Sequence, residues 1–376
     1  MWFRWRSWLW LHFSCGECNV EIRGIQWYPS QYTFGSVKGK LSLDELKAAI
    51  PHCNYIFLNG FCDVSASANT ATVRTSSMPD LDVAITYAHS LGFKVALRIK
   101  GAEWLKPSNP ILFLTNWADA VQQWAIWAQA RNVELFGVGG EAEYLEYDAY
   151  SPQWRNIIAK TRQVYSGTIY YNTNTWWSKA DRYTPGGENC IGLNAKLAAS
   201  WMNDLDYIAI SAYPNLTNTS NHPPYPNAPS VDQLIAAWHY YQMLTDMHGD
   251  DLVSEHYQLL SQHFAKKIIF HCGIASKWGN TNQPYDFSAG QVCLDEQTNW
   301  ITALFTVFNP LPWMEGYLFD GSWICVPLAE KPPNNYEFTI QNKPAQQVVA
   351  DYYAVATPNN YSLLILLGLA VILFAS

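Results

Sequence analysis

Residues 116–143, NWADAVQQWAIWAQARNVELFGVGGEAE, contain one complete helix-to-strand unit. Apolar residues at three- and four-residue spacing predict a helix over Asn116–Arg131. After a single polar residue, the short apolar run Val133–Val138 predicts a buried strand. Gly139 and Gly140 then end the strand and let the chain turn tightly.

The same unit recurs along the chain. The expected strands are Val20–Tyr28, Tyr55–Gly60, Lys94–Ile99, Val133–Val138, Thr168–Tyr171, Tyr207–Ala212, Lys267–Phe270 and Gly316–Phe319. The expected helices are Leu43–Ile50, Asp80–Leu91, Asn116–Arg131, Pro152–Val164, Leu193–Trp201, Val231–His248, Asp295–Val307 and Pro344–Tyr353. Eight strands, each followed by a helix, predict the α/β class and a single (β/α)8 barrel over residues 20–353. No linker divides this range.

The composition limits the kinds of partner. Of 376 residues, 49% are hydrophobic and only 14% are charged, which excludes a disordered chain. The net charge is −8, and the 23 Lys and Arg residues form no cluster. Because phosphate binding needs a basic surface, a nucleic-acid partner is not expected. The high content of Trp and Tyr, with 18 and 23 residues, is the feature of the composition that most needs an explanation.

The two ends of the chain favour export. Residues 1–19 resemble a short secretory signal, with Arg4 and Arg6 ahead of an apolar stretch. Residues 354–376 end in the apolar run Leu363–Ala375, which is shorter than a membrane helix of about 20 residues. This tail predicts either a lipid-anchor signal or a membrane-anchoring helix. With the glycosylation triplets at Asn215, Asn218 and Asn360, these features predict a secreted or surface glycoprotein attached to the membrane.

Cysteine usage is compatible with the same compartment. The chain has eight cysteines, which permit disulfides but do not specify their pairing. One pair is excluded if Cys53 and Cys62 lie on one extended strand. The ends of that strand would be about 30 Å apart, whereas a bridge needs Cα atoms within about 7 Å.

Polar and aromatic side chains cluster just after the expected strands, where the chemistry of a (β/α)8 barrel is located. They are Arg98, Lys100, Glu141, Glu143, Asn172, Asn174, Tyr213, His271, Asp320 and Trp323. Aromatic faces stack on sugars, and amides and carboxylates bind hydroxyls, so this mixture is typical of a glycan site. The sharpest signal is Glu141 after the glycines of the fourth strand. The alternative is a glycine-rich strand exit with two surface glutamates.

Several segments in order resemble glycoside hydrolase family 113, a family of retaining (β/α)8 glycosidases that includes β-mannanases. The segments are IQW (25–27), AHSLGFKV (88–95), YYNTNTW (170–176), LDYIAISAYP (205–214), GIASKWG (273–279), QPYDF (283–287), GYLFDGSW (316–323) and NKPA (342–345).

The resemblance implies that Glu141 is the general acid/base and that Trp323 lines the sugar subsite. It also implies that Tyr213 hydrogen-bonds the nucleophile and that Asn174 and Trp176 contact the substrate. From their positions at strand exits, Trp27, Arg98, Glu143 and Asp320 are further candidates for substrate binding.

The sequence departs from the family at the nucleophile. The family has a Thr-Glu-X-Gly pattern at the end of the seventh strand, and here the residues are Phe270-His271-Cys272-Gly273. His271 therefore stands where the nucleophilic glutamate should be, although a retaining mechanism needs two carboxyl groups about 5–5.5 Å apart. Asp320, Glu143 or the substrate itself could act instead. A metal site at His271 is not favoured, because no further ligand lies at metal-binding spacing. No cofactor is expected.

Three functions stay open. The first is a barrel that binds a β-linked, mannan-like oligo- or polysaccharide with lost or reduced turnover. The second is an active β-glycosidase with Glu141 as acid/base and a non-standard second carboxylate. The third is a structural surface protein. The tryptophans divide accordingly: Trp117, Trp124 and Trp127 have helical spacing and are expected to pack on the barrel. Those expected to line the cleft are Trp27, Trp104, Trp176, Trp278 and Trp323.

Overall fold

A computed structural model of the chain describes residues 20–175, 181–183, 189–218, 220–239, 253–286 and 288–355. Its centre is a closed barrel of eight parallel strands in the order β1-β2-β4-β5-β6-β9-β10-β11. The strands are β1 (Ile22–Tyr28), β2 (Tyr55–Ser65), β4 (Lys94–Lys100), β5 (Leu135–Gly140), β6 (Thr168–Asn174), β9 (Tyr207–Ser211), β10 (Ile268–Cys272) and β11 (Met314–Ile324). The predicted (β/α)8 fold is confirmed.

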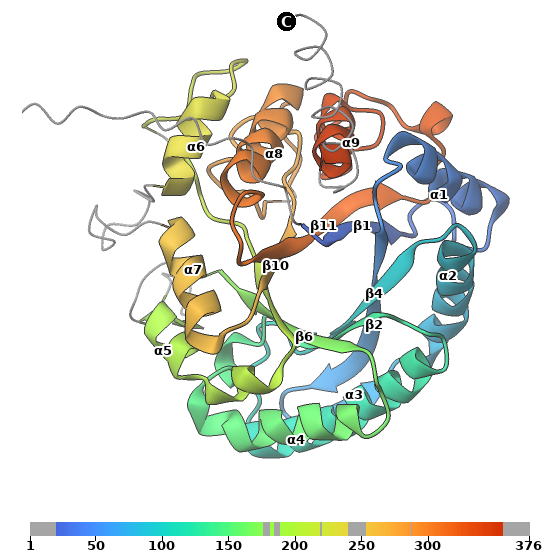
Figure 1. Ribbon diagram of the computed structural model, residues 1–376, viewed down its shortest axis with the longest axis vertical. Coiled ribbons are helices and arrows are strands. Elements are labelled where there is room, and N and C mark those ends of the chain that lie inside the picture. Colours follow the sequence, from blue (N-terminus) through green and yellow to red (C-terminus); the bar gives the residue numbers. More distant parts are fainter. Residues whose placement is uncertain are drawn as a thin grey trace, which may run out of the picture.

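Helices surround the barrel as an outer ring (Figure 1). They are α1 (Val37–Ala49), α2 (Met78–Ser90), α3 (Pro110–Gln129), α4 (Ser151–Arg162), α5 (Leu193–Ala198), α6 (Val231–His239), α7 (Val253–Phe264), α8 (Leu294–Phe308) and α9 (Pro344–Val355). The sequence prediction missed α7, although its apolar residues Tyr257, Leu260 and Phe264 have helical spacing and are buried. It also missed β3 (Thr70–Val73), which pairs antiparallel with β2, and the short pair β7 (Arg182–Tyr183) and β8 (Asn189–Cys190).

The period of two along each strand separates two apolar cores. One face of every barrel strand points inward, and there Phe57, Leu135, Tyr170 and Ile269 belong to a small apolar cluster that fills the barrel. The other face packs on the helices as a much larger core. This division decides whether a strand residue can reach the mouth of the barrel.

The predicted role of the α3 tryptophans is confirmed. Trp117 and Trp124 are fully buried, and their indole N–H groups donate to the carbonyls of Val138 and Phe61, at 3.1 and 3.3 Å. Trp127 is half-buried, and its ring lies against the Arg131 guanidinium at 4.0 Å. These rings belong to the scaffold.

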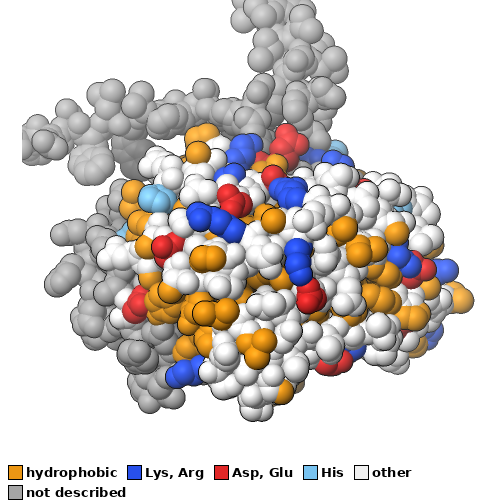
Figure 2. All heavy atoms as spheres, turned by 90° about the horizontal axis from the view of Figure 1, so that it is seen from below, with side chains coloured by type: hydrophobic (Ala, Val, Ile, Leu, Met, Phe, Trp, Pro, Cys, Tyr) orange, Lys and Arg blue, Asp and Glu red, His pale blue; other side chains and the backbone are white. Residues whose placement is uncertain are grey.

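The expectations about the chain ends fall largely outside the described residues, which exclude 1–19 and 356–376. Within the described part, no helix has the length and apolarity to cross a membrane. The disulfide expectation gains no support, because the cysteines whose side chains are described, Cys53, Cys62, Cys272, Cys293 and Cys325, are buried free thiols. On the face in Figure 2, lysine, arginine and acidic side chains are scattered among one another.

Candidate active site

A layer of polar side chains lies immediately above the small apolar cluster that fills the barrel. It is formed by residues two positions further along the strands, which therefore point inward like those below them. Its members are Asn59, Arg98, Asn172, Ser211, His271 and Asp320. This layer lies at the carboxyl ends of the strands, where barrels of this kind bind their ligands.

A cavity of about 630 Å³ opens above this layer. Five of the predicted site residues line it: Arg98, Glu141, Asn174, Tyr213 and Asp320. They come from β4, β6, β11 and the segments that follow β5 and β9, so the barrel brings together residues that are more than 200 positions apart in the chain. Their roles toward a ligand remain predictions.

Glu141 is held firmly at the exit of β5. Its backbone N–H donates to the Asn172 carbonyl at 2.7 Å, and its carbonyl accepts from the Trp104 N–H at 2.9 Å. Its Oε1 accepts from the Ser211 hydroxyl at 2.5 Å. Glu141 and Trp104 both have left-handed backbones, with φ of 51° and 55°. Such strain costs about 1–3 kcal/mol per residue and is concentrated at functional sites.

Glycine makes this strand exit possible. A Cβ on Gly137 would lie 2.7 Å from the ring of Tyr170, which fills the barrel interior. Gly139 has φ of 152°, a conformation that side-chain-bearing residues rarely adopt. The glycine-rich run noticed in the sequence therefore has a steric cause, and it delivers Glu141 to the cavity.

Asp320, from β11, is the second carboxylate of the cavity. Its Oδ2 accepts from the Tyr213 hydroxyl at 3.1 Å, and its Oδ1 lies 3.9 Å from Arg98 Nη2. Burial opposes ionisation of this carboxyl, but Arg98 and His271 more than offset it and hold its pKa at about 2. Burial also raises the pKa of Tyr213 well above its ordinary value, so its hydroxyl stays a hydrogen-bond donor.

Arg98 connects the two carboxylates. Its Nη1 lies 3.9 Å from Glu141 Oε1, and its Nη2 faces Asp320. The Arg98 side chain is only 4% exposed, whereas those of Glu141 and Asp320 are 23% and 19% exposed. The guanidinium thus forms the floor of the cavity, and the carboxylates face the space above it.

His271 lies beneath the cavity and does not line it. It is fully buried, with its ring edge-on to Phe57 and stacked on Tyr170. Its Nδ1 is 3.4 Å from Arg98 Nη1 and 3.8 Å from Asp320 Oδ1. Burial and the nearby Arg98 lower its pKa, so the imidazole is neutral at pH 7.

Aromatic and amide groups form the rest of the wall. Trp104 and Tyr285 are 37% and 43% exposed and line the cavity. Sequence reasoning named Trp104 but missed Tyr285, and it also missed Gln26, Tyr28 and Asn59. Gln26 accepts from the Gly321 N–H at 2.5 Å.

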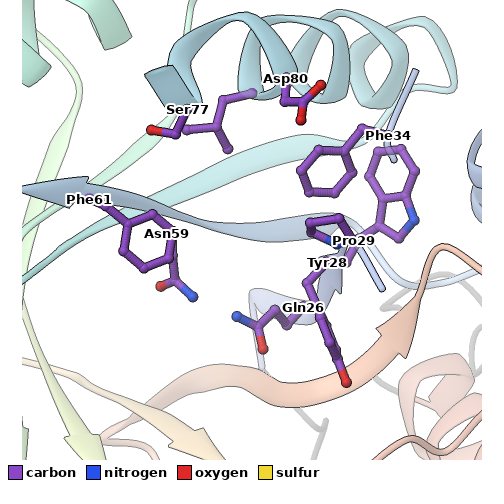
Figure 3. A pocket seen from close by; sticks show the side chains of 10 residues that line it. Gln26, Tyr28, Pro29, Phe34, Asn59, Phe61, Ser77 and Asp80 are labelled. Carbon is purple, nitrogen blue, oxygen red and sulfur yellow. The ribbon is translucent and has the colours of Figure 1, made fainter. Parts of the chain in front are cut away.

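A second cavity of about 350 Å³ adjoins the first and shares Gln26, Tyr28 and Asn59 with it. Figure 3 shows the rings of Phe34, Phe61 and Tyr28 around this space, with Asp80 and Ser77 contributed from α2 and the residue before it. The two cavities are therefore neighbours that share part of one wall.

Comparison with known proteins identifies the family. The sequence model of Glycoside Hydrolase Family 113 matches residues 111–343, which is more than half of the chain. The chain belongs to glycoside hydrolase family 113. No curated protein sequence matches it significantly.

Solved structures agree with this family 113 fold. The chain is similar to the GH113 β-mannanase AaManA from Alicyclobacillus acidocaldarius in complex with ManMIm, with a TM-score of 0.67, 20% identity and coverage of 91% of this chain and 100% of that one. A GH113 β-1,4-mannanase gives a TM-score of 0.64 at 19% identity, with 89% and 99% covered. A β-glucuronidase from Ruminococcus gnavus gives 0.53 at 11% identity, with 89% and 50% covered.

Trp27 and Trp323 do not line the larger cavity of this family 113 barrel, and Trp323 lines neither cavity, which corrects the expectation for Trp323. They are neighbours on β1 and β11, and both are fully buried against α1. The Trp27 indole donates to the Ser42 hydroxyl at 3.1 Å, and the Trp323 indole donates to the Ser42 carbonyl at 2.7 Å. Trp27 borders only the second cavity, and Trp176 lies outside the described residues.

Glu143 is also corrected, because it points away from the cavity into a buried charged cluster. It is 1% exposed, and its Oε2 accepts from the Ile191 N–H at 3.0 Å. Lys196 Nζ lies 4.0 Å from Glu143 and 2.9 Å from Glu146. Burial raises the pKa of Glu143 to about 8; Lys196 opposes the shift, and Glu146 adds to it. Burial therefore favours the neutral form of this carboxyl.

Glu143→Gln tests this placement. Because the folded-state pKa is raised, wild-type stability is lost as the pH rises from about 4.5 through about 8, and a neutral amide removes this loss. The variant should gain about 1–3 kcal/mol relative to wild type between pH 4.5 and pH 8.5. Urea denaturation at a series of pH values measures the difference. A difference that does not change with pH would contradict a buried, neutral carboxyl.

Proposed function

We propose that the chain binds a neutral, β-linked, mannan-like glycan in the 630 Å³ cavity, and that its turnover is reduced or lost. The observation that carries this proposal is the combination of Glu141, Tyr213 and Asp320, which line the cavity, with the exposed aromatic rings of its wall. Membership of family 113 and the β-mannanases of similar fold support the choice of glycan.

The charges at the site favour a neutral ligand. Among the described residues that line the cavity, the cations Arg98 and Lys100 are balanced by the anions Glu141 and Asp320. Each cation already has an acidic neighbour, since Lys100 lies 3.8 Å from Glu103. An acidic sugar would find no surplus positive charge. The second cavity beside the first favours a ligand of more than one sugar.

The replaced nucleophile is the reason to propose reduced turnover. On β10 the family position holds a neutral, buried imidazole, which cannot form the glycosyl-enzyme ester of a retaining mechanism. A second candidate function, an active β-glycosidase with Glu141 as acid/base, is favoured by one observation. Asp320 supplies another ionised carboxylate to the same cavity.

Calorimetric titration with β-1,4-mannotetraose tests the binding proposal. We expect saturable binding to the full chain, weakened at least tenfold, or by about 1.4 kcal/mol, in Trp104→Ala and in Tyr285→Ala, since both rings border the cavity. Trp127→Ala is the matched control, because its indole lies on the outer helix α3. No binding of mannotetraose, or equal loss in the control, would contradict the proposal.

A further inference from the structure

We propose that the second cavity binds a protonated amine, carried by an unacetylated amino sugar whose neighbour in the glycan occupies the larger cavity. This inference deepens the proposed function and rests on it, because it assumes that a glycan occupies the larger cavity. Of the residues that line the second cavity, whose volume is about 350 Å³, the sequence predicted a role for Trp27 alone.

The second cavity has one charged group, the Asp80 carboxylate, among the described residues that line it. Asp80 is exposed in the first turn of α2, where the helix N-terminus favours a negative charge. Within the described part of the chain, this carboxylate takes part in no ion pair or hydrogen bond. The larger cavity, whose charges are balanced, therefore suits a neutral sugar, whereas the second cavity offers an unpaired anion to a cation.

Neither the helix nor the nearby arginine uses the Asp80 carboxylate. An acidic residue three positions after a helix cap commonly accepts from the backbone N–H of the cap. Here that N–H, of Ser77, donates to the Arg74 carbonyl instead, at 3.3 Å. The Arg74 guanidinium lies 5.5 Å from the centre of the Phe61 ring, but it pairs with Asp63 at 2.7 Å. Asp80 is thus left for a ligand.

Aromatic rings form much of the remaining wall. Trp27, Tyr28, Phe34 and Phe61 all line the second cavity, and Figure 3 shows the last three around the same space as Asp80. The rings of Trp27 and Phe34 are in contact, with centroids 4.6 Å apart. The face of an aromatic ring attracts a cation within about 6 Å, most strongly where water is excluded. Aromatic rings beside one unpaired carboxylate favour a cationic ligand over a neutral or an anionic one.

Hydrogen-bond acceptors favour a primary amine among cations. The Ser77 hydroxyl donates to the Arg74 carbonyl at 2.9 Å, so its oxygen is left to accept. The Asp80 carboxylate is an acceptor only. A protonated primary amine has three N–H donors for such groups, whereas a quaternary ammonium has none.

The wall shared by the two cavities indicates that the amine belongs to a sugar. Gln26 and Asn59 line both cavities. Their side-chain oxygens already accept, from the Gly321 N–H at 2.5 Å and from Arg98 Nε at 3.3 Å. Their amide NH₂ groups are therefore left to donate to ligand hydroxyls. A glycan with one unit in each cavity would contact these two residues along its length.

The test compares D-glucosamine with D-glucose, which differ only in an amine or a hydroxyl at C2. Each sugar is titrated calorimetrically into the full chain at about pH 6, where a simple amine is protonated. We expect glucosamine to bind about tenfold more tightly or better, because hydrogen bonds to a charged group are the strong ones. Equal binding of the two sugars, or no binding of either, would overturn the inference. Choline, a cation without N–H donors on its nitrogen, should bind more weakly than glucosamine, and equal or tighter binding of choline would overturn the choice of a primary amine.

Two variants locate the site. In Asp80→Asn the preference for glucosamine over glucose should disappear, whereas Asp232→Asn should keep it. Asp232 is the matched control, because it is exposed in the first turn of α6 and lines neither cavity. A preference that survives in a folded Asp80→Asn would overturn the inference; if circular dichroism shows that this variant does not fold, the comparison of the sugars on the wild type decides. Wild-type binding of β-1,4-mannotetraose without a preference for glucosamine would overturn this inference alone, and absence of mannotetraose binding would overturn the proposed function.

Discussion

In Glu141→Gln, we expect any hydrolysis of β-1,4-mannotetraose by the chain to fall by about 10²–10⁴-fold, or about 2.7–5.5 kcal/mol in activation free energy. The amide cannot protonate the departing oxygen, which is the step that a sugar leaving group needs most. Its carbonyl can still accept from Ser211, and the backbone bonds to Asn172 and Trp104 do not involve the side chain. The strained strand exit should therefore be preserved.

Leaving-group chemistry separates acid catalysis from a general loss of function. An aryl mannoside with an acidic phenol needs little proton assistance, so Glu141→Gln should reduce its hydrolysis much less than that of mannotetraose. Glu21→Gln is the control for charge removal, because Glu21 is exposed just before β1, at the opposite end of the barrel. Equal losses on both substrates would argue against Glu141 as the general acid.

For His271→Glu we expect hydrolysis of mannotetraose to increase by about 10²-fold or more, with the β-anomer as the first product. In the alignment that we propose, the substitution places a carboxylate where the family carries its nucleophile, which would supply the second carboxyl group of a retaining pair. The His271 Nδ1 lies 3.4 Å from Arg98 Nη1, so the new carboxylate would have a cation beside it from the start. Without that partner, burying the charge at this position would be strongly unfavourable.

His271→Gln is the matched control for this gain. It introduces the same side-chain length without a charge, so a rise in rate in the glutamate variant alone isolates the carboxylate. Stopped assays with mannotetraose and proton NMR of the product measure rate and configuration together. A folded His271→Glu that binds mannotetraose but gains no activity would contradict the alignment of His271 with the nucleophile.

The two variants examine one charge network. Arg98 lies within 3.9 Å of Glu141 and Asp320 and within 3.4 Å of His271. Burial lowers the pKa of Arg98, but Asp320 and Glu141 outweigh this and raise it, so the guanidinium stays charged. A single cation thus stabilises two ionisable carboxylates and disfavours a charged imidazole. Changing any member alters the electrostatic surroundings of the other three.

Strand periodicity explains which site residues could have been found without a structure. On β1, Ile22 belongs to the barrel interior, so Gln26 shares its face and Trp27 lies on the opposite one. On β11, Leu318 is interior, which places Asp320 inside and Trp323 outside. The expectation that Trp27 and Trp323 line the cleft was based on residue type and did not take this alternation into account. The residue type indicates which chemistry a side chain can perform. The alternation along the strand decides whether that side chain faces the barrel interior or the surrounding helices.

The two glutamates of Glu141-Ala142-Glu143 show where this reasoning ends. Both follow the last residue of β5, where the period of two no longer applies. Glu141 turns into the cavity because its left-handed backbone and Ser211 direct it there. Glu143 begins a short turn and lies near Lys196, which is 53 residues further along the chain. No local pattern distinguishes them, because their partners belong to distant elements.

The sequence by itself determined the order of the eight barrel strands and the resemblance to the family, and it predicted that His271 stands in place of the nucleophile. Those properties depend on local periodicity and on the order of motifs, both of which are written along the chain. Only the tertiary structure decided that Trp27, Trp323 and Glu143 lie outside the larger cavity and that Tyr213 pairs with Asp320. Those facts depend on whether each side chain points into the closed barrel or out of it, and on contacts between residues more than 100 positions apart.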